Sequence, residues 1–304
     1  MRAQERPKVT RKDQYGCRVS ESSRIGMSSQ AALAERFRAL HRSGRAFILP
    51  NAWDVPSARM FEELGFPAVA TSSAGLMVSL GYPDGQYMPR VELISAVKKI
   101  SSVLSVPLSA DVVAGYGASP REVTESVKGF IDAGAVGVNI EDFEHSTRKL
   151  YPVTDQVEKI KELKQLSDTM GVPFVINART DALRYAAGNE EQRFTECVAR
   201  AKAYRDAGAD CVYPMGLLET RSIQKFVAEL QFPTNVMVRK GLADFNTLEQ
   251  LGVRRVSFGP SASYAVFGFL RRVCKKVIET GDFSALTDGA ITYEELNALA
   301  KRKA

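Results

Sequence analysis

Short runs of β-branched and apolar residues alternate with longer amphipathic segments along most of the chain. Eight runs are predicted as strands: Phe47–Pro50, Ala68–Thr71, Pro107–Asp111, Gly137–Glu141, Phe174–Ala178, Asp210–Pro214, Asn235–Val238 and Arg255–Phe258. Helical periodicity predicts helices at 30–43, Ser57–Leu64, Arg90–Val103, Pro120–Ala133, Asp155–Met170, Glu190–Ala207, Ser222–Leu230, Thr247–Leu251 and Ala262–Thr280. Alternation of this kind implies parallel strands.

Helix boundary residues support the same division. Glycines at 65, 134, 171, 208 and 252 follow helical patterns, where a left-handed C-terminal residue favours glycine. Eight strand–helix units favour an α/β fold, a (β/α)₈ TIM barrel, over an open doubly wound sheet, and such a barrel needs about 250 residues. We predict a basic, disordered extension over residues 1–28. A single barrel domain with an N-terminal helix follows over residues 29–304.

The formal net charge of +6 is concentrated at the N-terminus. Residues 1–28 hold seven Lys and Arg against three Asp and Glu, which accounts for +4 of the +6. The rest of the chain is close to neutral, which argues against a nucleic-acid partner. No run approaches the roughly 20 apolar residues that cross a bilayer, so no membrane partner and a cytoplasmic location are expected.

Cysteine and histidine usage narrows the possible chemistry. The four cysteines are widely spaced and form neither a zinc motif nor a disulfide framework. The chain has two histidines, His41 and His145, so a histidine-rich metal site is excluded.

Polar residues gather where the predicted strands end, which is where barrel enzymes place their active sites. Asp84, Asp111 and Glu141 would face one mouth, and three carboxylates in one pocket need a compensating cation. Oxygen ligands favour Mg²⁺ or Mn²⁺. Arg179 supplies a cation that can bind a carboxylate or enolate, and Ser72 and Ser73 offer hydroxyl and backbone N–H donors. Taken singly, these residues are equally typical of helix caps, turns and structural ion pairs.

Several segments resemble the isocitrate lyase/phosphoenolpyruvate mutase superfamily across roughly residues 30–280. Asp84 and Asp111 are also 27 positions apart (111 − 84), as in that family. The matching segments are Leu49-Pro50-Asn51-Ala52-Trp53-Asp54, Thr71-Ser72-Ser73-Ala74-Gly75, Gly81-Tyr82-Pro83-Asp84, Asp111-Val112-Val113-Ala114-Gly115-Tyr116-Gly117, Asn139-Ile140-Glu141-Asp142 and Asn177-Ala178-Arg179-Thr180-Asp181.

The resemblance implies a role for each matching residue. Asp111 corresponds to the direct Mg²⁺ ligand, and Asp84 and Glu141 to carboxylates that hold its waters. Arg179 would stabilise an enolate, so Asp84, Glu141 and Arg179 are the catalytic candidates. The substrate-binding candidates are Thr71, Ser72, Ser73, Trp53 and Asn235. The resemblance also implies a homo-oligomer, either a dimer or a tetramer with a swapped C-terminal helix.

Two departures from the family pattern bear on activity. Val113 stands where the family has a second acid after Asp111, which predicts weaker metal binding. The segment Phe143–Val153, which we expect to form a mobile lid, lacks the cysteine that acts as the acid in isocitrate-type lyases. This places the chain in a non-lyase branch, with His145 the one candidate proton donor in that segment.

Four functions remain open on the sequence. The first is a Mg²⁺-dependent enzyme that acts on a small 2-oxo or 2-hydroxy carboxylate through an enolate and makes or breaks a C–C or P–C bond. An oxaloacetate decarboxylase or hydrolase, or a phosphonopyruvate hydrolase or phosphonomutase, would be of this kind. The second is a lyase of a substituted malate or methylisocitrate, and the third is a 2-oxo-acid-binding protein with weakened catalysis. The fourth, a Schiff-base aldolase, would depend on Lys240 and is disfavoured.

Overall fold

The computed structural model describes residues 29–301, and the predicted extension over residues 1–28 lies outside this range. Each of the eight predicted strands is present. The first ends at Leu49, because Pro50 lacks a backbone N–H group, and the chain continues as a further short strand beyond the predicted end. The strands are β1 (Phe47–Leu49), β2 (Asn51–Ala52), β3 (Val69–Thr71), β4 (Leu108–Asp111), β5 (Gly137–Glu141), β8 (Val175–Thr180), β9 (Cys211–Pro214), β10 (Asn235–Met237) and β11 (Arg255–Ser257).

Parallel pairing joins these strands into two sheets, in the orders β2-β3-β4-β5-β8-β9 and β1-β11-β10. A single parallel bridge between Val212 in β9 and Thr234, the residue before β10, links the two sheets on one side. On the other side β1 continues through Pro50 into β2. The pairing therefore returns to the strand where it began, and the predicted parallel α/β arrangement is confirmed.

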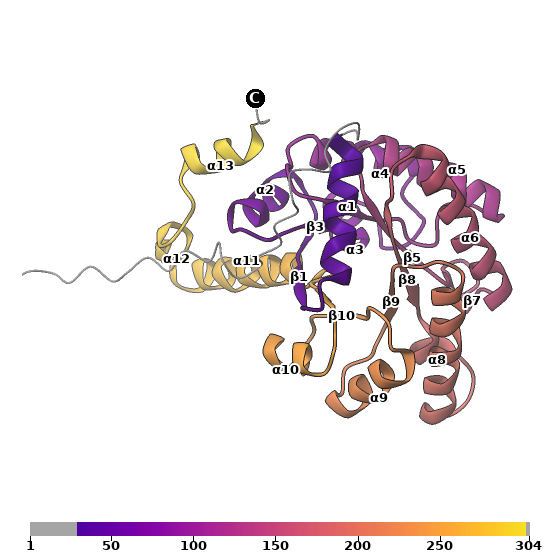
Figure 1. Cartoon of the computed structure of the whole chain (residues 1–304). Coiled ribbons are helices and arrows are strands. Elements are labelled where there is room, and N and C mark those ends of the chain that lie inside the picture. Colours follow the sequence, from indigo (N-terminus) through magenta and orange to yellow (C-terminus); the bar gives the residue numbers. More distant parts are fainter. Residues whose placement is uncertain (1–28, 302–304) are drawn as a thin grey trace, which may run out of the picture.

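The predicted helices lie between and outside the strands (Figure 1). They are α1 (Ser29–Arg42), α2 (Val55–Glu63), α4 (Arg90–Ser101), α5 (Pro120–Asp132), α6 (Val153–Met170), α8 (Glu190–Asp206), α9 (Thr220–Leu230), α10 (Phe245–Gln250) and α11 (Ser261–Thr280). Helix α5 shows how the sequence determines them. Ser119 and Glu122 form a capping box around Pro120, and Val123, Val127 and Phe130 recur at helical spacing on its buried face.

Some elements were not predicted. The short helix α3 (Ser73–Ser79) directly follows β3, with Ser72 as its N-cap, and α7 (Ala182–Tyr185) follows β8. After α11 the chain continues through α12 (Ser284–Thr287) to α13 (Tyr293–Ala300), which packs against α2 (Figure 1). The segment expected to be a lid forms an antiparallel hairpin of β6 (Phe143–Glu144) and β7 (Lys149–Leu150).

Helix α1 covers the amino-terminal ends of the strands. The Phe37 side chain, which is fully buried, lies directly over Gly137 at the start of β5, where a Cβ atom would come within 2.6 Å of the Phe37 ring. It also makes edge-to-face contacts with His41 and Phe47. The side chains of α1 thus pack over this end of the strand bundle. None of the helices within residues 29–301 is long and apolar enough to cross a membrane.

Candidate active site

A cavity of about 240 Å³ opens at the carboxyl ends of the strands. Seven of the residues singled out in the sequence line it, together with polar residues from deeper in the strands. The seven are Thr71, Ser72, Ser73, Asp84, Asp111, Arg179 and Asn235. The fold therefore brings together side chains that are up to 164 positions apart (235 − 71).

Ser73 connects the two acids of the cavity. Its backbone N–H donates to Asp111 Oδ2 over 3.1 Å, and its hydroxyl donates to Asp84 Oδ1 over 3.2 Å. The hydroxyl of Ser72 forms no hydrogen bond with either acid; it accepts a hydrogen bond from the N–H of Gly75 and caps α3. Burial and the nearby Asp111 carboxylate raise the pKa of Asp84 above its ordinary value. The two carboxylates thus repel each other across a shared donor.

Asp111 also begins a line of side-chain hydrogen bonds across neighbouring strands. Asn139 Nδ2 donates to Asp111 Oδ1 over 3.1 Å, and Asn177 Nδ2 donates to Asn139 Oδ1 over 2.7 Å. The backbone N–H of Asp111 donates to Thr71 Oγ1 over 2.9 Å. Asp111 is therefore held by β3 through its backbone and by β5 through its carboxylate, with β8 supporting Asn139 in turn.

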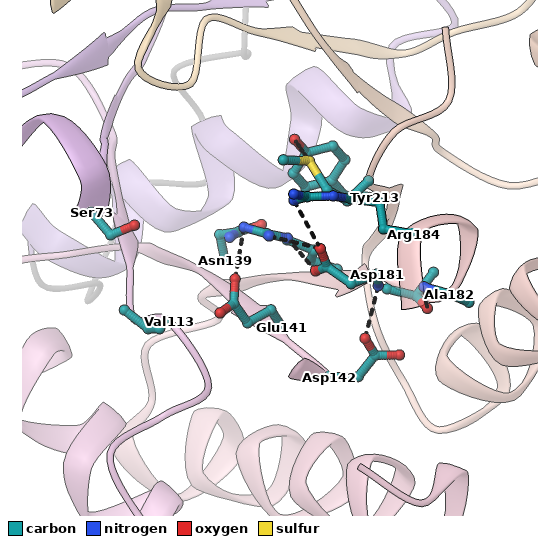
Figure 2. Close-up of polar contacts among 12 residues, drawn as sticks. Ser73, Val113, Asn139, Glu141, Asp142, Asp181, Ala182, Arg184 and Tyr213 are labelled. Carbon is teal, nitrogen blue, oxygen red and sulfur yellow. Dashed lines mark hydrogen bonds and ion pairs between the residues drawn. The ribbon is translucent and has the colours of Figure 1, made fainter. Parts of the chain in front are cut away.

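Arg179 is held between two carboxylates at the end of β8. Its Nε and Nη2 atoms form a two-point contact with Asp181, at 2.7 and 3.0 Å, and its Nη1 lies 2.7 Å from Glu141 Oε2. Figure 2 shows Glu141 and Asp181 converging, with Tyr213 and Arg184 on the same side. Burial opposes the charge of Arg179, but Asp181 and Glu141 together raise its pKa well above the ordinary value. The guanidinium is therefore a fixed, permanent cation.

The β6–β7 hairpin brings His145 to the same place. Its Nε2 lies 2.5 Å from Glu141 Oε1, so both carboxylate oxygens of Glu141 are engaged. Burial raises the pKa of Glu141, while Arg179 and His145 oppose that shift. The bond to Glu141 raises the pKa of His145 in turn. A Cβ atom on Gly85 would lie 3.0 Å from His145 Nδ1, so the hairpin also approaches the segment that carries Asp84.

Two predicted site residues, Glu141 and Trp53, lie outside the cavity lining, and so does Val113. Glu141 stands behind Arg179 rather than in the lining, and Trp53 lines a separate, more apolar cavity with Leu76 and Met88. Val113 is only 2% exposed and packs in the hydrophobic core. Its φ angle of 55° is unusual for a β-branched residue, whereas Asp and Asn tolerate this region better. In Figure 2 Val113 lies apart from the Glu141–Asp181 group.

Several residues of the site were not anticipated. Arg184 and Tyr264 line the cavity from α7 and α11, and Ser109, Ser257 and Arg255 line it from inside the strands. The sequence pattern could have predicted the residues that line the cavity from inside the strands. Polar residues two positions away from an inward-facing residue point the same way, as Ser109 does relative to Asp111. Arg184 and Tyr264 lie on helices whose sequence pattern contains no comparable signal.

Comparison with known proteins agrees with this architecture. The family model described as phosphoenolpyruvate phosphomutase matches residues 37–278. The uncharacterized protein Rv1998c of Mycobacterium tuberculosis is 32% identical over 264 residues, covering 86% of this chain and 95% of that protein. The 2-methylisocitrate lyase of Bacillus subtilis is 27% identical over 213 residues, covering 68% and 67%.

Solved structures are similar over most of their length. A putative lyase/mutase from Burkholderia cenocepacia superposes with a TM-score of 0.81 at 33% identity, covering 89% of this chain and 96% of that one. An oxaloacetate acetylhydrolase in complex with oxalate gives 0.78 at 26% identity, covering 89% and 94%. A phosphonopyruvate hydrolase in complex with oxalate and Mg²⁺ gives 0.76 at 25%, covering 88% and 94%. The chain therefore belongs to the phosphoenolpyruvate phosphomutase family, within the isocitrate lyase/PEP mutase superfamily of lyases and mutases.

Proposed function

We propose that this protein is a Mg²⁺-dependent enzyme that acts on a small 2-oxo acid through an enolate and breaks or makes a C–C or P–C bond. The observation that carries the proposal is the convergence of Arg179 with the Asp84–Ser73–Asp111 group in one small cavity. We further propose that the two sheets act as one (β/α)₈ barrel within a single domain over residues 29–304. Its amino-terminal end lies under α1, and the reaction takes place at the carboxyl ends of the strands.

The donor set of the cavity fits a hydrated Mg²⁺ ion. Within residues 29–301 no three His, Cys, Asp or Glu side chains are grouped to hold an ion among them. Magnesium, however, is usually bound through one or two carboxylates and keeps several waters. Asp111 would bind the ion, with Asp84 holding its waters, and Glu141 would act through Arg179. When bound, Mg²⁺ or Mn²⁺ supplies the positive charge that stabilises an enolate.

The remaining residues bind and orient the substrate. A guanidinium has five N–H groups, and Arg179 uses three of them on Asp181 and Glu141, which leaves two for an oxygen in the cavity. Because the fork with Asp181 fixes the plane of the guanidinium, those two N–H groups are already oriented before the substrate binds. The hairpin that carries His145 stands beside this position, where it would limit the access of water.

A second candidate is a lyase of a substituted malate or a methylisocitrate. It is favoured by the similarity to a 2-methylisocitrate lyase and to a solved 2,3-dimethylmalate lyase, which is 25% identical with a TM-score of 0.76. Against it stands the hairpin, which has no cysteine between residues 143 and 153. A 2-oxo-acid-binding protein with weakened catalysis is a third candidate. It is favoured by Val113, whose buried side chain adds no carboxylate to the cavity.

A substrate panel tests the proposal. We expect Mg²⁺-dependent turnover of oxaloacetate or phosphonopyruvate, followed as release of pyruvate, oxalate or phosphate, and loss of that turnover on chelation. We expect no cleavage of isocitrate or 2-methylisocitrate, followed as release of glyoxylate or pyruvate. Robust cleavage of either, unchanged in His145→Ala, would favour the lyase. Mg²⁺-dependent binding without any turnover would favour the binding protein.

A further inference from the structure

The floor of the cavity contains a buried arginine without an anionic partner. Arg255, the first residue of β11, is only 2% exposed, and it lines the same cavity as Asp111 and Arg179. Its Nε and Nη1 atoms have no hydrogen-bond partner among residues 29–301, and within that range no carboxylate lies at ion-pair distance from it. A buried charge without a partner is strongly unfavourable, so we expect an anionic ligand to supply the partner of this arginine.

Strand geometry directs Arg255 toward the interior of the strand bundle. Arg255 and Ser257 both line the cavity, whereas Val256 between them packs in the hydrophobic cluster under the helices. In the sheet Arg255 pairs with Phe47 on one side and Asn235 on the other. The interior of a barrel is normally filled by branched apolar side chains. Here the corresponding layer is polar and borders open space.

The Asp111 carboxylate of the same cavity attracts Arg255, but it lies beyond ion-pair distance, and the other described groups around Arg255 provide no anion. Beneath it, the guanidinium lies 5.9 Å from the centre of the Phe37 ring. The adjacent His41 is neutral, because burial and Arg255 lower its pKa to about 3. Burial lowers the pKa of Arg255 itself to about 10, so it remains a cation at neutral pH. The open side of the guanidinium is the cavity.

Two further residues of the cavity lining carry buried polar atoms without partners among the described residues. Ser109 Oγ and Asn235 Oδ1 are both buried and unbonded, and both residues line the cavity. Asn235 Nδ2 donates to Ser257 Oγ over 3.1 Å. Turning that amide over would let the Ser257 hydroxyl donate to Asn235 instead, and it would point an N–H group into the cavity. Arg255, Ser109 and Asn235 can then all donate to one anion.

We infer that Arg255 and Ser109 form a second anion-binding position on the cavity floor, and that the substrate is a 2-oxo diacid whose far carboxylate binds there. This inference rests on the proposed function, which places the 2-oxo acid end at Asp111 and Arg179. Ser109 precedes Asp111 by two residues, a step of about 6.6 Å along a strand, which is about the length of a four- or five-carbon diacid. A 2-oxo monoacid would leave Arg255 unpaired.

Calorimetry in the presence of Mg²⁺ on ligand pairs of matched length tests this. We expect 2-oxoglutarate to bind at least about tenfold more tightly than 2-oxopentanoate, because only the diacid supplies a partner for the buried cation. Arg255→Met should abolish that preference and leave oxalate, which occupies the 2-oxo acid end alone, bound as before. Arg255→Lys, which keeps the charge but lacks the fork, should retain part of the preference, and Ser109→Ala should reduce it less than Arg255→Met.

Arg254→Met is the matched control. Arg254 is the preceding residue and lines a different cavity with His41, so its loss should leave the preference for the diacid unchanged. If oxalate fails to bind the wild type with Mg²⁺, the proposed function is wrong. If oxalate binds but 2-oxoglutarate is not preferred, or Arg255→Met and Arg255→Lys both keep the full preference, the second anion position is wrong and the polar floor holds only water.

Discussion

At the scale of single residues, Ser73 is the residue that links the two acids of the cavity, because it donates to both Asp84 and Asp111. The N–H of Gly85 adds a donor to Asp84, and Asn139 and the N–H of Val113 add donors to Asp111. Glu141 belongs to a different group, because Arg179 and His145 occupy its two oxygens. The acids therefore divide into a pair that faces the cavity and a third that holds Arg179 in place.

Asp111→Ala should abolish Mg²⁺-dependent binding of oxalate, because the carboxylate proposed to bind the ion is lost. Ser119→Ala is a suitable comparison, since Ser119 caps α5 away from the cavity. It should cost about 1 kcal/mol of stability and leave Mg²⁺-dependent binding unchanged. The two variants are compared by thermal unfolding with and without Mg²⁺ and oxalate. Equal Mg²⁺-dependent stabilisation of wild type and Asp111→Ala would rule out Asp111 as the ligand.

At the scale of elements, α6 follows directly after the hairpin and carries a buried cation. Lys159 is 1% exposed, its Nζ lies 3.6 Å from the centre of the Tyr151 ring, and it has no hydrogen-bond partner among the described residues. Tyr151 in turn accepts from Arg200 Nη1 through its carbonyl and donates through its N–H to the carbonyl of Asp142. The end of the hairpin is thus fixed against α6 and α8.

Burial lowers the pKa of Lys159 from 10.5 to about 8. The unfolded chain therefore binds more protons between these pH values, and the wild-type stability gains a contribution as the pH rises across that window. At pH 7 the lysine is charged in both states and its burial is unfavourable. Lys159→Met should raise the free energy of unfolding by about 1–2 kcal/mol at pH 7, after the loss of the contact with the Tyr151 ring.

The gain in the free energy of unfolding from Lys159→Met should shrink as the pH rises from 8 toward 10.5. Denaturant unfolding at several pH values would measure this change. Lys161→Met provides the control, because Lys161 is exposed on the same helix and pairs with Glu158. Its effect should be small and nearly independent of pH over this range. If the free energies of unfolding of Lys159→Met and wild type differ by the same amount from pH 7 to 10.5, the lowered pKa of Lys159 is contradicted.

At the scale of the whole molecule, α11 and the arm that follows it expose many apolar side chains. Phe267, Phe269 and Ile278 are 48%, 51% and 86% exposed on α11, and Tyr293 is 79% exposed on α13. Isolated apolar residues on a surface need no explanation, but a contiguous apolar surface marks an interface. An interface formed through the C-terminal helix, in the expected dimer or tetramer, would cover these side chains.

We predict that the protein sediments as a dimer or tetramer and that Phe267→Glu combined with Phe269→Glu shifts it to a monomer. The reason is that each charge would have to be buried without a partner in the assembled state. Lys275→Glu changes the charge of the same helix at an exposed ion pair with Glu279, and it should leave the assembly intact. Analytical ultracentrifugation measures all three proteins. A monomeric wild type at micromolar concentration would refute the prediction.

The amino-acid sequence alone predicts the order of the eight parallel strands and of nine helices, and seven of the residues that line the cavity. The period-2 and helical patterns are local, and the rule that barrel chemistry lies at the carboxyl ends of strands identified Asp84, Asp111, Arg179 and the Ser72–Ser73 pair. Trp53 was placed at the same mouth because it closely follows a strand. The chain instead turns there into α2, and Trp53 lines a neighbouring apolar cavity.

The partners of these residues depend on the tertiary fold. Glu141 contacts Arg179 and His145, which belong to separate segments. The spacing of these residues in the sequence therefore does not predict that both carboxylate oxygens of Glu141 are bonded. The buried position and positive φ of Val113 depend on the path of the loop after β4. Arg255 looks in the sequence like an ordinary basic residue before an apolar one. Its burial follows from the parallel pairing of β11 with β1 and β10, which turns its side chain inward beneath the acids.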